Sequence, residues 1–132
     1  MKLGPLPAAL AAVFALRTAA GEPPKGPTPK IILLEPGDKD YLPLLGGPPE
    51  TASMRSGLVT LAPGKAVGAH STGRNEEMLV PLTGSGELRI EGRAPIAIRS
   101  GLVTYTPAHT RHDVVNTGTG PLRYIYVVAR AE

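Results

Sequence analysis

The sequence lacks cysteine altogether, and aromatic residues make up only 4% of its 132 residues. Without cysteine the chain has neither a disulfide framework nor a thiolate metal site. Few aromatic residues beside 16 glycines and 15 prolines are typical of a chain with many turns and short strands. No helical period of useful length is present after residue 30. The composition therefore predicts an all-β protein with one domain.

The chain also lacks a large excess of charge of one sign. Its formal net charge of +3 includes Lys2 and Arg17, and the remaining chain has 12 basic and 11 acidic side chains. Nucleic-acid binding requires a concentrated basic face. Arg89, Arg93 and Arg99 alternate with apolar residues, which is typical of the solvated faces of strands. We therefore expect no nucleic acid among the partners.

The N-terminal residues 1–20 have the pattern of a signal peptide. Lys2 precedes an apolar stretch over 3–16, and the small residues Thr18, Ala19 and Ala20 follow. The apolar stretch is shorter than the roughly 20 residues of a membrane span. We expect cleavage near Ala20, export to a periplasm or the cell exterior, and no membrane contact afterwards. The alternative is a retained N-terminal anchor.

The remaining chain divides into a short tether and a folded domain. Residues 21–29 are rich in proline and glycine, which favours an extended tether, and the domain is expected over 30–132. Short apolar runs separated by Gly, Pro, Asn and Asp predict strands. These strands are expected at 30–34, 53–61, 77–83, 87–90, 94–98, 102–105, 112–116 and 122–129. Closure of a sheet into a barrel leaves no edge strand with unpaired backbone groups, so the pattern predicts a jelly-roll barrel.

Two segments of this predicted barrel contain all three histidines and a well-placed glutamate. Strand alternation puts Glu77 on one face with Leu79, and Glu76 on the other. A carboxylate turned into a barrel is costly unless it is paired or binds a cation. With His70 and His112 beside Glu77, the donors suit Zn, Fe, Mn, Ni or Cu and leave coordination positions open. The alternatives are ordinary histidines, and an inward-facing Glu76 in place of Glu77.

The two segments resemble the paired motifs of the cupins, G-x5-H-x-H-x3-4-E-x6-G and G-x5-P-x-G-x2-H-x3-N. Residues at the motif positions are Gly64, His70, Glu77 and Gly84 in the first segment, and Gly101, Pro107, His112 and Asn116 in the second. The resemblance implies a double-stranded β-helix, the jelly-roll barrel of the cupin family. It also implies a divalent transition metal held by His70, Glu77 and His112.

Two positions depart from these motifs. Thr72 stands where the family has a second histidine, so a three-ligand site is expected, with Thr72 as a weak ligand or as the holder of a water molecule on the metal. His109 replaces the glycine of the second motif. There it is a candidate catalytic residue for proton transfer or a replacement ligand, although an exposed loop histidine is the plainer interpretation.

The expected function is that of an exported, metal-binding cupin whose partner is a small oxygen-bearing molecule. Bound metal would support dioxygenase-type or isomerase-type chemistry. The alternative is a non-catalytic domain that binds a sugar or an organic acid at a degenerate metal site. The resemblance further implies a homodimer, and the apolar run over 31–34 fits an edge strand that needs a partner.

Overall fold

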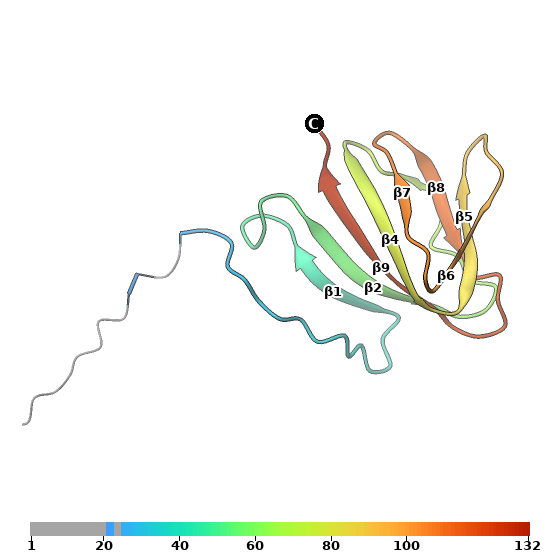
Figure 1. Ribbon diagram of the computed structural model, residues 1–132, viewed down its shortest axis with the longest axis horizontal. Coiled ribbons are helices and arrows are strands. Elements are labelled where there is room, and N and C mark those ends of the chain that lie inside the picture. Colours follow the sequence, from blue (N-terminus) through green and yellow to red (C-terminus); the bar gives the residue numbers. More distant parts are fainter. Residues whose placement is uncertain (1–20, 23–24) are drawn as a thin grey trace, which may run out of the picture.

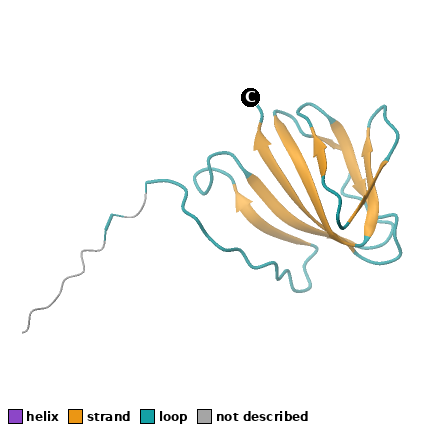
Figure 2. Ribbon diagram, in the orientation of Figure 1, coloured by secondary structure: helices purple, strands orange, loops and turns teal. Residues whose placement is uncertain are grey.

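The computed structural model describes residues 21–22 and 25–132, and this part of the chain contains strands, turns and loops but no helix (Figure 2). No segment of it is therefore a helix able to cross a membrane. The predicted signal peptide, 1–20, lies outside the described residues. The strands are β1 (Tyr41–Gly46), β2 (Arg55–Leu61), β3 (His70–Ser71), β4 (Asn75–Thr83), β5 (Ser85–Ile90), β6 (Ile96–Arg99), β7 (Thr104–Thr106), β8 (Arg111–Val115) and β9 (Leu122–Arg130).

The strands form two antiparallel sheets, and the all-β jelly-roll prediction is confirmed. One sheet has the order β1-β2-β9-β4-β7 and the other the order β3-β8-β5-β6. Figure 1 shows β1, β2, β9 and β4 side by side in one layer, with β5, β6 and β8 in the layer next to it. Strands distant in sequence are paired, such as β2 and β9, whose pairing covers the whole length of β2. The larger sheet is therefore held together by long-range contacts.

The core lies between the two sheets. Its buried side chains come from both layers and are Leu79, Leu88, Ile98, Val114, Leu122 and Tyr124. In β4 the alternation predicted from the sequence is present, because Glu77, Leu79 and Pro81 are buried while Met78 is exposed. Glu77 rather than Glu76 thus faces the interior, as the sequence indicated.

The prediction of a strand over 30–34 is wrong. No strand forms there, and the side chains of Ile31 and Leu33 are 93% and 69% exposed. The edge strand of the larger sheet is instead β1, which pairs with β2 and has a register shift between Pro43 and Leu45. Proline is tolerated in an edge strand because it removes a donor that no neighbour needs.

Candidate metal centre

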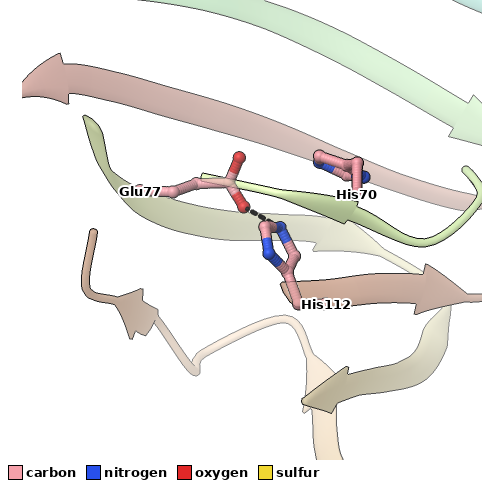
Figure 3. Close-up of side chains that lie close together, drawn as sticks. All are labelled: His70, Glu77 and His112. Carbon is pink, nitrogen blue, oxygen red and sulfur yellow. Dashed lines mark hydrogen bonds and ion pairs between the residues drawn. The ribbon is translucent and has the colours of Figure 1, made fainter. Parts of the chain in front are cut away.

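Three side chains from three strands meet at one end of the barrel interior. His70 comes from β3, Glu77 from β4 and His112 from β8, and each offers a donor atom within 4.8 Å of the others (Figure 3). The pairing of β3 with β8 puts His70 directly opposite His112, and their ring centroids are 4.5 Å apart. The structure thus brings together the three predicted ligands, of which Glu77 and His112 are buried and His70 is exposed.

His112 has an acceptor at each ring nitrogen. Its Nδ1 donates to the carbonyl oxygen of Thr110 at 3.1 Å, and its Nε2 donates to Oε1 of Glu77 at 2.9 Å. Two acceptors favour the doubly protonated ring, and the hydrogen bond to Glu77 raises the pKa of His112 above its ordinary value despite burial. In this form the protein holds a buried ion pair between Glu77 and His112.

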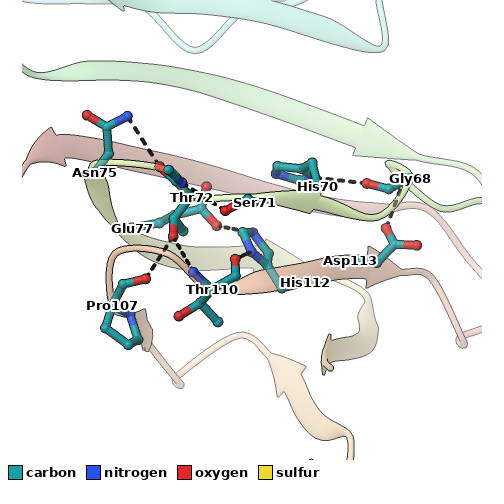
Figure 4. A network of polar contacts seen from close by, with 11 residues as sticks. Gly68, His70, Ser71, Thr72, Asn75, Glu77, Pro107, Thr110, His112 and Asp113 are labelled. Atoms are coloured by element: carbon teal, nitrogen blue, oxygen red, sulfur yellow. Dashed lines mark hydrogen bonds and ion pairs between the residues drawn. The ribbon is translucent and has the colours of Figure 1, made fainter. Parts of the chain in front are cut away.

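His70 is oriented by the backbone next to it. Its Nδ1 is 2.8 Å from the carbonyl oxygen of Gly68 and donates to it (Figure 4). The Gly68 N–H in turn donates to Oδ1 of Asp113 at 2.9 Å. A carbonyl partner at Nδ1 leaves the Nε2 lone pair of His70 available for a metal.

The cluster fits a divalent transition metal by the chemistry of its donors. Both imidazoles have a backbone carbonyl at Nδ1, so each would bind through Nε2, and Glu77 supplies a carboxylate oxygen. Two imidazoles and one carboxylate suit Zn, Fe, Mn, Ni or Cu. Three protein ligands leave further positions for small molecules, which is typical of reactive and binding sites rather than closed structural ones.

The hydroxyl of Thr72 takes part in two hydrogen bonds within the protein. Its hydroxyl donates to the carbonyl of Pro107 at 2.8 Å and accepts from the N–H of Thr110 at 3.0 Å (Figure 4). These bonds connect the β3–β4 turn to the loop before β8. Thr72 thus supports the loop that leads into β8, the strand of His112, and its role as a weak ligand or as the holder of a water molecule stays a prediction.

His109 lies away from the cluster. Its side chain is 61% exposed, and its Nε2 is 3.9 Å from Oε1 of Glu132. The residue has a φ of 56°, and its N–H donates to the carbonyl of Gly73. His109 is not among the residues that line the cavity beside the cluster, which is the position that proton transfer would require.

A cavity of about 430 Å³ adjoins the cluster inside the barrel. His70 and Glu77 form part of its wall. The rest consists of three tyrosines, Tyr41, Tyr124 and Tyr126, and of aliphatic side chains, Val59, Leu61, Ala66, Val67, Leu79 and Val114. Its size is that of a pocket for a small molecule. No local pattern indicates this lining, since only strand pairing shows that the three tyrosines face one cavity.

Thr106 faces Glu77 directly across the β4–β7 pair and was not singled out by the sequence. It is fully buried, and its hydroxyl has no hydrogen-bond partner among the described residues. We expect Thr106→Val to raise the free energy of unfolding by about 1 kcal/mol, because it replaces an unsatisfied hydroxyl with a methyl group of similar size. Urea denaturation measures this change. If the variant were instead less stable by about 1 kcal/mol, the Thr106 hydroxyl would have a hydrogen-bond partner in the folded protein.

The fold and the cluster together define a cupin-type barrel with a His-Glu-His centre. The model of the Cupin domain matches residues 57–128, which is more than half of the chain. The chain therefore belongs to the cupin domain family. This stretch contains all three residues of the cluster. No curated protein matches the sequence.

Solved structures give the same result for the fold. A cupin 2 conserved barrel domain protein from Salinispora arenicola is 25% identical, with a TM-score of 0.62 over 77% of this chain and 92% of that one. A protein from Bacillus halodurans is 20% identical, with a TM-score of 0.68 over 82% and 86%. A cupin with a double-stranded β-helix fold from Methanocaldococcus jannaschii is 18% identical, with a TM-score of 0.64 over 80% and 94%.

Proposed function

We propose that this protein is a metal-binding cupin whose centre, formed by His70, Glu77 and His112, binds or transforms a small oxygen-bearing molecule in the adjoining cavity. The observation that carries the proposal is the buried Glu77 carboxylate with two imidazoles, all with donor atoms within 4.8 Å, at the wall of a cavity of about 430 Å³. A purely structural barrel gains nothing from an ionisable pair at this position that apolar side chains would not provide.

A divalent ion held by these residues would act as a Lewis acid that orients an oxygen atom of the substrate and stabilises negative charge. The chain itself contributes the orientation of the donors. Backbone carbonyls of Gly68 and Thr110 fix the two imidazole rings, and aliphatic side chains form much of the wall beside them. The chemistry is of dioxygenase or isomerase type. A non-catalytic binding role is the second candidate, favoured by the threonine at position 72 in place of a second histidine.

Metal binding by the chelator-treated protein tests the proposal. We expect about one Zn²⁺, Mn²⁺ or Fe²⁺ ion per chain by calorimetry and mass spectrometry. Glu77→Gln and His112→Ala are expected to weaken binding more than about 100-fold, since loss of an outer partner of a metal ligand already weakens binding about 10- to 100-fold. Glu76→Gln is the matched control, because Glu76 is the neighbouring carboxylate of β4 and is not part of the cluster. In the wild type it accepts a hydrogen bond from the exposed Tyr105. Equal affinity in all four proteins would refute the metal centre.

Export and dimer formation are part of the same proposal. The pattern of residues 1–20 supports export, and the exposed apolar side chains of Ile31 and Leu33 support contact with a second copy of the chain.

A further inference from the structure

The wall of the cavity beside the centre is mostly apolar. Apart from His70 and Glu77, the lining consists of aliphatic side chains and of three tyrosines. No lysine, arginine, amide or aliphatic hydroxyl side chain lines it in the part of the chain that the structure describes. A polyhydroxylated ligand would therefore lose most of its hydrogen bonds to water without replacement, at a cost for each buried hydroxyl left unpaired.

Two of the three tyrosines are hydrogen-bonded to each other. The rings of Tyr41 and Tyr126 are stacked, with centroids 6.4 Å apart and an interplanar angle of 10°, and their hydroxyl oxygens are 2.8 Å apart. Gly57 makes room for the pair, because a Cβ atom there would be 2.5 Å from the Tyr41 ring. One of the two hydroxyl hydrogens is used within the pair, so the pair offers a ligand its ring surface and a single free hydroxyl donor.

Charge in the cavity is confined to the end with the metal centre. A divalent ion with the Glu77 carboxylate and two neutral imidazoles would have a net charge of about +1. This end can accept one neutral or singly anionic oxygen-bearing group. Among residues 21–22 and 25–132, no cationic side chain lines the opposite wall to pair with a second anionic group, and the burial of such a group without a partner is strongly unfavourable.

We infer that the natural ligand has one oxygen-bearing head, bound at the His70, Glu77 and His112 end, and an apolar, uncharged body packed against the aliphatic side chains and the Tyr41–Tyr126 pair. The position of the oxygen-bearing head rests on the proposed function, because it requires the metal centre. The apolar character of the body is inferred from the cavity wall alone. Sugars and dicarboxylates are excluded from this class, because a sugar has hydroxyls throughout and a dicarboxylate has a second anionic group away from the head.

Matched probes with six-membered rings test this selectivity by NMR titration. For the zinc-loaded protein we expect benzoate, with one head, to bind at least about tenfold more tightly than terephthalate, which has a second carboxylate at the far end of the same ring. For the metal-free protein we expect benzyl alcohol to bind at least about tenfold more tightly than myo-inositol. Each ratio corresponds to about 1.4 kcal/mol.

A pair of variants locates the binding. Ala66 is exposed at the cavity wall, so Ala66→Phe is expected to fill the cavity and to abolish benzoate and benzyl alcohol binding without loss of the fold. Ala97→Phe, at an exposed position of β6 outside the cavity, is the control and should bind as the wild type does.

The outcomes separate this inference from the proposed function. If zinc does not bind but benzyl alcohol is preferred over myo-inositol and is lost in Ala66→Phe, the metal centre is refuted and the apolar cavity is confirmed. If zinc binds but terephthalate binds as tightly as benzoate, the inference is overturned. Equal binding of myo-inositol and benzyl alcohol overturns it as well, whether or not the metal binds.

Discussion

His112→Leu is expected to lower the free energy of unfolding of the metal-free protein by about 3 to 5 kcal/mol. His112 is 2% exposed and Glu77 8% exposed, and the Nε2–Oε1 hydrogen bond of 2.9 Å joins them. Removal of the imidazolium leaves a carboxylate buried without its partner, and loss of one member of a buried ion pair costs an amount in this range. Urea denaturation at pH 6 of protein treated with a chelator measures the change.

The double variant Glu77→Leu/His112→Leu separates the pair from the packing. We expect it to be more stable than His112→Leu alone, because apolar side chains of similar volume replace a buried ion pair with little loss. Added zinc should raise the melting temperature of the wild type and leave both variants unchanged. A double variant less stable than the single one would show that packing, and not the unpaired carboxylate, causes the loss.

The pH dependence of stability provides a second measurement on the same pair. The pKa of His112 is raised in the folded protein, mainly by the hydrogen bond to Glu77. The stabilisation is therefore complete below the ordinary histidine pKa of about 6.5 and is lost as the pH rises through the raised value. Metal-free wild type should lose stability over this window relative to His112→Leu. If the free energy of unfolding changed with pH in parallel in the two proteins, His112 would not be the group with the raised pKa.

Gly84→Ala is expected to destabilise the protein by about 3 kcal/mol or more. Gly84 follows β4 with a φ of +80°, and a Cβ atom there would lie 2.3 Å from the carbonyl oxygen of Pro121 and 2.9 Å from Cα of Leu122. The positive φ costs an L-residue about 1–2 kcal/mol, and forced overpacking against backbone atoms adds about 1–3 kcal/mol. Denaturant unfolding of the purified variant measures the total.

Gly92→Ala is the matched control for this prediction. Gly92 has a φ of +73°, and a Cβ atom there would meet nothing within 4 Å. Gly92→Ala should therefore lower the free energy of unfolding only by the cost of the backbone conformation, about 1–2 kcal/mol. Equal losses at the two positions would show that the approach of residues 121 and 122 to β4 is looser than the structure indicates.

Much of the fold followed from local patterns. Alternation in β4 correctly predicted that Glu77 and Leu79 face inward, and turn residues correctly separated most strands. The strand predicted over 30–34 was wrong because an apolar run without alternation does not specify a partner. Strand β1 was missed because Pro43 interrupts it, and its place at the sheet edge was invisible in the sequence.

The sequence by itself determined the family, the interior face of β4 and the three candidate ligands, because residue types at fixed spacings and strand alternation are local properties of the chain. Only the tertiary structure decided that His70 and His112 lie opposite each other, that Thr72 supports a loop and that Tyr41 stacks on Tyr126. These contacts join residues far apart in the chain, so they depend on strand register and sheet order, which no local pattern specifies.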